Sequence, residues 1–150
     1  MRDVFGAIFP ISSENVSSLF DQRRSVFVKF SKFLKLKKGS KIVFYLSKEK
    51  KLVGEGKITK VEKMNPKIAW VRYKKQIFLN ENEYNQYVEK SPISGKNRKM
   101  TEIAIFMLKD LKRYRNQIDC MFNVTPSGRY LTQEEYQRIA KRTRGLVAKG

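Results

Sequence analysis

The segment from residue 41 to residue 63 constrains the fold most, because it has the pattern of two neighbouring strands joined by a charged turn. Its first part (KIVFYLS) is rich in β-branched and aromatic residues, and its second part alternates apolar and polar residues between Ile58 and Glu62. Such alternation is typical of an antiparallel strand with one face in water. Gly54 and Gly56 interrupt the second strand and predict a bulge or bend of the kind that closes a small barrel.

The rest of the chain predicts further short strands and helices with capping signals. Pro10 closes the first apolar run, Asn80 with Glu83 and Thr132 with Glu135 have capping-box spacing, and residues 68–71 fit either a helix or a strand. The predicted strands lie at 4–9, 25–30, 101–108 and 120–124, the predicted helices at 14–22, after 80 and after 132, a loop at 112–115 and a frayed basic tail from about 141 to 150. Many short strands with two or three short helices predict a single α+β domain over residues 1–150, with a mostly antiparallel barrel at its centre.

The chain is strongly basic, and the charge is not confined to one end. Its 33 Lys and Arg against 14 Asp and Glu give a formal net charge of +19. Each third of the sequence has a basic surplus, which favours a folded basic surface over a disordered arm. Nucleic acid is the usual polyanionic partner of such a surface, although a lysine-rich proteome would also raise the charge.

Residue types that are missing or rare exclude several kinds of site. There is no histidine, so His-based catalysis is excluded. Cys120 is the only cysteine, so no internal disulfide can form and a zinc site has no plausible set of ligands. No metal or cofactor is therefore expected. The first ten residues lack the pattern of a signal peptide and no apolar run approaches a membrane span, so we expect a cytoplasmic protein without a membrane partner. The oligomeric state stays open.

Four stretches of the sequence resemble an uncharacterised archaeal family of the PUA-like superfamily. They are IFPI at 8–11, VFVK at 26–29, LKKGSKIVFY at 36–45 and SGRYL at 127–131. The hairpin together with VGEG at 53–56 is also similar to the core of EVE and ASCH domains. The resemblance implies a PUA-like pseudo-barrel with helices at its openings, and a cleft beside the barrel that binds RNA or a modified nucleobase. It favours RNA over DNA.

Basic and aromatic residues are interleaved at three places, as single-stranded RNA recognition requires. In the first, Phe27 and Phe33 are expected in the core while Lys29 and Lys32 point outward. The other two give as candidate contacts Arg113, Tyr114 and Arg115, and Arg129 and Tyr130. The competing interpretations are a solvated charge cluster for the second place and a chain-reversing turn for the third. Trp70 is expected in the core rather than at a stacking surface.

A hydrolase is the alternative to a non-catalytic binding domain. Some ASCH-like proteins use a lysine and a glutamate near the cleft, and Lys29 with Glu55 could form such a pair and act on a modified nucleoside. A lysine base needs desolvation and an orienting carboxylate. The sequence lacks the full lysine–arginine signature of ASCH domains, so binding without catalysis is the preferred hypothesis. A third hypothesis is an interaction module within a ribonucleoprotein.

Overall fold

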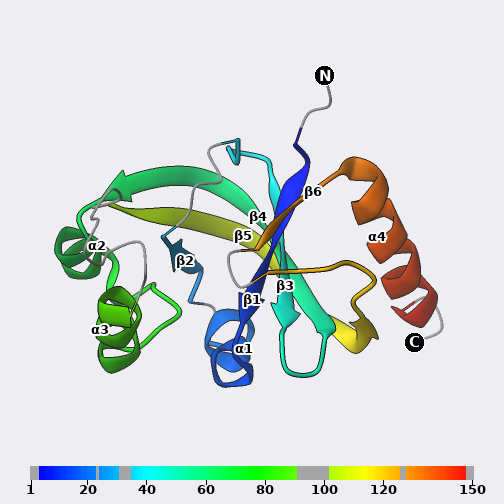
Figure 1. Ribbon diagram of the computed structural model, residues 1–150, viewed down its shortest axis with the longest axis horizontal. Coiled ribbons are helices and arrows are strands. Elements are labelled where there is room, and N and C mark those ends of the chain that lie inside the picture. Colours follow the sequence, from blue (N-terminus) through cyan, green and yellow to red (C-terminus); the bar gives the residue numbers. More distant parts are fainter. Residues whose placement is uncertain (1–3, 23, 31–34, 91–101, 126–127, 148–150) are drawn as a thin grey trace.

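The computed structural model describes residues 4–22, 24–30, 35–90, 102–125 and 128–147, and these form an α+β fold around one curved sheet (Figure 1). The strands are β1 Gly6–Ile11, β2 Val26–Lys29, β3 Lys41–Leu46, β4 Lys51–Met64, β5 Ile103–Asp119 and β6 Arg129–Leu131. The helices are α1 Ser13–Phe20, α2 Pro66–Tyr73, α3 Glu81–Lys90 and α4 Gln133–Val147. The strand order is β2-β5-β4-β3-β1-β6, and β1 with β3 is a parallel pair in an otherwise antiparallel sheet.

The predicted hairpin is confirmed as β3 and β4, and the predicted irregularity lies where the glycines are. The register of β4 against β5 shifts between Leu52 and Gly54 and again between Glu55 and Lys57. A Cβ at Gly54 would lie 2.4 Å from the Phe20 ring and 2.7 Å from the Lys112 carbonyl oxygen, so only glycine fits there. These bulges bend the long β4–β5 pair, and the sheet curves over the core as a half-barrel (Figure 1).

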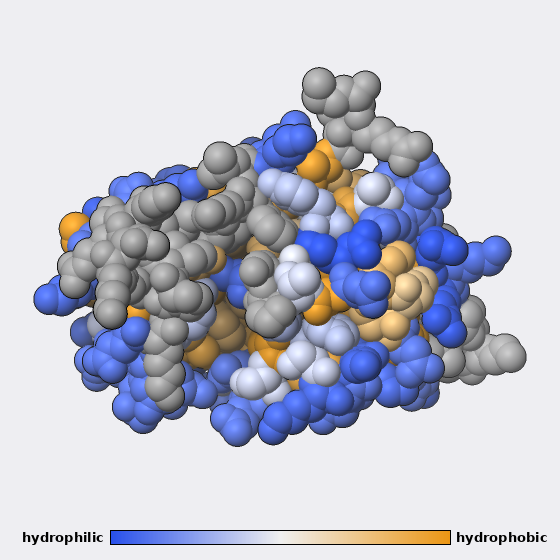
Figure 2. Space-filling view, viewed as in Figure 1, coloured by the Kyte–Doolittle hydropathy of each residue, from blue (hydrophilic) through white to orange (hydrophobic). Residues whose placement is uncertain are grey.

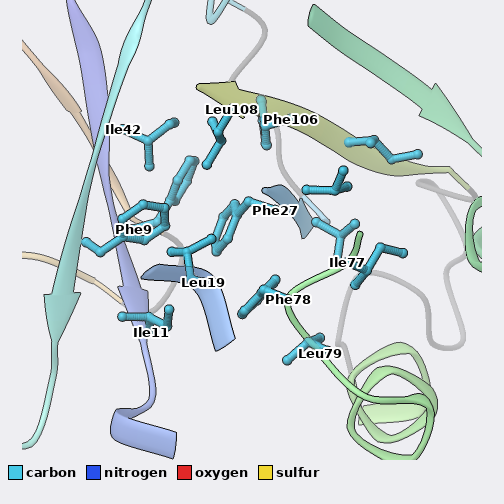
Figure 3. Packing of buried hydrophobic residues seen from close by; sticks show 14 of the residues in the cluster. Phe9, Ile11, Leu19, Phe27, Ile42, Ile77, Phe78, Leu79, Phe106 and Leu108 are labelled. Carbon is cyan, nitrogen blue, oxygen red and sulfur yellow. The ribbon is translucent and has the colours of Figure 1, made fainter. Parts of the chain in front are cut away.

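Phenylalanine rings fill the concave side of the sheet (Figure 3). Phe27 of β2 lies 5.5 Å from the Phe9 ring, 5.2 Å from Phe44 and 4.9 Å from Phe78. Phe27 is 2% exposed, so its predicted place in the core is confirmed. These contacts join β2 to the β1–β3 pair, with which β2 shares no hydrogen-bonded ladder. Packing of the apolar rings excludes water from the space between them.

A second apolar cluster lies on the opposite, convex side, beneath α4. Ile8, Val43 and Leu131 of the sheet pack there with Ile139 of the helix. Alternate residues of a strand point to opposite faces, so Ile8 belongs to this cluster while Phe9 belongs to the concave core. The helix begins with the predicted capping box: Glu135 donates its backbone N–H to the Thr132 hydroxyl and accepts the Thr132 N–H.

Several local predictions were wrong. Residues 112–115 are part of β5 rather than a loop, residues 120–124 form no strand, and α4 continues through the stretch predicted to fray as far as Val147. In the first and third cases a long-range contact decides, since β5 is held by pairing with β4 over its length and α4 by packing against β5. Pro10 lies within β1 instead of ending it. The ambiguous segment 68–71 is helical, in α2, where Trp70 is half-buried against Tyr84 at 5.0 Å between ring centroids.

Candidate nucleic-acid interface

A cleft of about 430 Å³ opens between the end of β1, α1, β2 and α3. Its volume is in the range of small-molecule sites. Its apolar wall is made by Pro10, Ile11, Phe27, Val28, Phe78 and Leu79. Its polar groups are Ser12, Glu14, Asn15, Lys29, Glu83, Gln86 and Tyr87. The cleft therefore combines aromatic surface with several hydrogen-bonding side chains, two of them amides.

Lys29 is the cation of this cleft, and it does not point freely outward as the sequence predicted. Its ammonium lies 5.5 Å from the centroid of the Phe9 ring, on the concave side of the sheet. Burial lowers the pKa of Lys29 from 10.5 to about 8, because the low-dielectric surroundings penalise the charged form. At neutral pH the cleft thus presents a positive charge that is only weakly screened by water.

Tyr87 and Asn15 are each held in place by a hydrogen bond, which is long-range in sequence for Tyr87 and local for Asn15. The Tyr87 hydroxyl accepts a hydrogen bond of 2.8 Å from the backbone N–H of Phe30, just beyond β2. Burial raises the pKa of Tyr87 to about 12, although the hydrogen bond from the Phe30 backbone acts in the opposite direction. Asn15 donates to the Ser12 hydroxyl at 2.9 Å, and its carbonyl oxygen has no partner within the described residues. An acceptor on Asn15 is therefore available to a ligand.

The structure does not bring Lys29 and Glu55 together. Glu55 pairs in register with Val43, and Val43 pairs with Ile8, so the three side chains share the convex face. Lys29 lies on the concave face with Phe9. The sheet itself separates the two groups that the hydrolase hypothesis paired.

Glu55 instead receives three hydrogen bonds in a buried polar network beneath α4. Lys41 donates to it at 2.8 Å, Tyr136 at 2.6 Å and Tyr114 at 3.0 Å. Burial by itself would raise the pKa of Glu55, but the hydrogen bonds from Lys41 and Tyr136 outweigh that effect and hold the pKa below its usual value. The pKa of Lys41 is raised, since its hydrogen bond and ion pair with Glu55 outweigh its own desolvation. This network joins β3, β4, β5 and α4.

Comparison with known proteins places the chain in a family. Residues 4–133 match the family model described as "Domain of unknown function (DUF365)". The chain belongs to the DUF365 family. A relative in the archaeon Methanocaldococcus jannaschii, called an uncharacterized protein, is 34% identical over 107 residues, which cover 68% of this chain and 98% of the relative.

Solved structures show which fold this DUF365 protein has. ASCH from Zymomonas mobilis superposes with a TM-score of 0.74 at 19% identity, covering 91% of this chain and 94% of that one. The N-terminal domain of Staphylothermus marinus McrB superposes with a TM-score of 0.57 at 16% identity, covering 95% and 98%. The PUA-like fold of the ASCH type, which the sequence resemblance implied, is confirmed.

The Arg113–Arg115 candidates of this DUF365 protein do not form one exposed contact surface. Tyr114 is 5% exposed and uses its hydroxyl to hold Glu55. Burial, with the Glu55 charge beside it, raises the pKa of the Tyr114 hydroxyl well above its usual value. Arg113 makes an ion pair of 2.9 Å with Asp21, and Arg115 is exposed. Alternation along β5 places Tyr114 on the opposite face from Arg113 and Arg115, because neighbouring strand residues point to opposite faces.

Arg129 and Tyr130 lie in β6, at the sheet edge away from the β2 side of the cleft. Arg129 pairs with Glu135 at 2.6 Å and lies 4.9 Å from the centre of the Phe122 ring. The Tyr130 hydroxyl accepts the backbone N–H of Lys35 at 3.2 Å. Gly128, with a φ of 93°, redirects the chain into β6, which favours the turn interpretation of this motif. Lys32, the remaining predicted contact, lies outside the described residues.

Sequence reasoning missed most of the cleft. Asn15, Gln86 and Tyr87 were not singled out, since each lies in a helix whose pattern predicts only amphipathicity. No local signal identifies them, because the cleft exists only once α1 and α3 pack against β2. Over the described ranges, no group of His, Cys, Asp and Glu side chains could hold a metal ion. Within the same residues, no helix has the length and apolar character needed to cross a membrane.

Proposed function

We propose that this DUF365 protein is a non-catalytic RNA-binding domain that takes an unpaired base, standard or modified, into the cleft beside β2. The observation that carries the proposal is a desolvated lysine in a cleft walled by aromatic rings. The partly exposed Tyr87 offers ring surface for a base beside the buried rings of Phe27 and Phe78, and the amides of Asn15 and Gln86 offer hydrogen bonds to its edge. The fold of ASCH type and the charge of +19 support a nucleic-acid partner.

A polyanionic partner needs a polar surface with a basic surplus, and the sequence supplies that surplus. Figure 2 shows hydrophilic residues over most of the face in view, with hydrophobic residues reaching the surface in small areas. Counterion release from phosphates would supply the affinity, and the cleft would supply the selectivity. RNA is preferred to DNA because unpaired, splayed-out bases are what RNA loops present.

Filling the cleft from its rim tests this function. Gln86 is exposed on α3 at the cleft, and Gln117 is exposed on β5, outside the cleft. Labelled total archaeal RNA should crosslink to the wild-type protein and to Gln117→Trp. Gln86→Trp should reduce crosslinking at least about fivefold, because loss of base stacking and hydrogen bonds costs over about 1 kcal/mol. Sequencing the crosslinked RNA identifies the target. Undetectable crosslinking of the wild type, or equal crosslinking of all three proteins, would refute the proposal.

The hydrolase alternative through Lys29 and Glu55 has no support in the geometry, since the two groups lie on opposite faces of the sheet. Turnover of N-acylated nucleosides that disappears both in Lys29→Met and in Glu55→Gln, with the fold intact, would restore it. Turnover that survives Lys29→Met would exclude Lys29 as a base.

A further inference from the structure

Three lysines lie opposite one another across three neighbouring strands on the convex face. Lys41 of β3 lies opposite Lys57 of β4, and Lys57 lies opposite Lys109 of β5. Residues directly opposite each other in adjacent strands project from the same face, with about 4.8 Å between strands. These three lysines share their face with Glu55, which is two residues from Lys57 along β4.

A bulge brings a fourth lysine to the same face. Lys112 lies opposite Glu55, so β5 uses three residues to pass from Lys112 to Lys109 where β4 uses two. The extra residue is accommodated at Asp110, whose φ of 52° is left-handed. Without the bulge, Lys109 and Lys112 would point to opposite faces of the sheet.

The charges of this group are not balanced within the described part of the chain. Glu55 neutralises Lys41 at 2.8 Å. No carboxylate of the described residues lies within 4.0 Å of the ammonium groups of Lys57, Lys109 or Lys112, and Asp110 makes no ion pair there. Lys109 and Lys112 are exposed and Lys57 is half-buried. Like charges directly opposite each other destabilise a sheet, so an external anion would relieve this arrangement.

The cleft is a poor place for the phosphates of a bound RNA. Its lining contains two carboxylates, Glu14 and Glu83, against the single cation Lys29. The net negative charge would repel a phosphodiester. The exocyclic amino groups of a base could instead donate hydrogen bonds to the carboxylates. Phosphate contacts must therefore come from another surface.

We propose that Lys57, Lys109 and Lys112, defined here as the lysine row, bind the phosphodiester backbone of the RNA whose base enters the cleft. The inference rests on the proposed RNA-binding function and adds where the backbone is held. The cleft is on the concave side and the lysine row on the convex side, so the two sites contact different nucleotides of one strand.

The salt dependence of binding tests the lysine row. The triple variant Lys57→Gln, Lys109→Gln, Lys112→Gln is compared with Lys48→Gln, Lys74→Gln, Lys75→Gln, which removes the same charge from exposed lysines elsewhere. The probe is fluorescein-labelled oligocytidine, whose bases carry an exocyclic amino group, titrated between about 50 and 200 mM salt. Three lost phosphate contacts should flatten the slope of log K against log salt by about 2, which corresponds to about 50-fold weaker binding at about 0.15 M salt.

The remaining outcomes separate this inference from the proposed function. The variant with arginine at the three row positions should keep the wild-type slope, and the control triple should change it by less than about 0.5. Equal slopes for both glutamine triples would overturn the lysine row while total RNA still crosslinks to the wild type. Failure of the wild type to crosslink to any RNA would instead refute the proposed function, and the lysine row with it.

Discussion

Lys29→Met removes the charge that the cleft wall desolvates, and its effect on stability can be worked out from the structure. Lowering the pKa of Lys29 from 10.5 to about 8 corresponds to about 3 kcal/mol of unfavourable free energy for the charged form. Methionine keeps most of the side-chain volume but loses the contact of the ammonium with the Phe9 ring, worth about 1 kcal/mol. We therefore expect the free energy of unfolding to rise by about 2 kcal/mol at pH 7.

The pH dependence is the sharper part of this prediction. Below pH 8 both the folded and the unfolded chain hold the Lys29 proton, so its contribution is constant. Between pH 8 and pH 10.5 the unfolded chain binds more proton than the folded one, and the wild type gains stability as the pH rises. Relative to Lys29→Met, the wild type should gain about 1.4 kcal/mol by pH 9 and about 2.5 kcal/mol by pH 10.

Urea unfolding of both proteins at pH 7, 8, 9 and 10 measures this difference, and titrations common to both proteins cancel. Lys75→Met, at an exposed position, removes the same formal charge and should show no such trend. A difference between wild type and Lys29→Met that stays constant from pH 7 to pH 10 would show that Lys29 is not desolvated in the cleft.

Three further substitutions test the parts of the fold that position the cleft and the convex face. Glu55→Gln leaves the half-buried Lys41 beside a neutral amide, so unfolding should become easier by about 2 kcal/mol in denaturant titrations. Because the pKa of Glu55 lies below its usual 4.5, its stabilising effect is lost as the pH falls through that lowered value; acid titration should therefore destabilise the wild type more than Glu55→Gln. Gly128→Ala puts a Cβ 2.5 Å from the Phe9 ring at a φ of 93°, and the melting temperature should fall by an amount equivalent to at least about 2 kcal/mol; an unchanged melting temperature would contradict the close approach. Asn80→Ala removes the hydrogen bond of 2.8 Å to the Glu83 backbone N–H and should cost about 1 kcal/mol in thermal unfolding, with Asn82→Ala on the exposed side of α3 as the matched control.

The elements that the sequence predicted well are those with local causes. The β3–β4 hairpin follows from alternation and a short turn, and the capping boxes at Asn80 and Thr132 follow from hydrogen bonds that span three residues. The basic charge and the absence of histidine are also properties of the sequence alone. The charge favours a polyanionic partner, and the absence of histidine excludes His-based catalysis, whatever the fold.

Only the tertiary structure decided where the chemistry-bearing side chains lie. Tyr114 belongs to a run that looks like an exposed basic loop, yet pairing of β5 with β4 buries it against Glu55. Lys29 and Glu55 looked like a possible pair, yet strand alternation and the Ile8–Val43–Glu55 register put the sheet between them. The face that a strand residue occupies depends on bulges and partners distant in sequence, so neither the cleft nor the lysine row follows from local pattern.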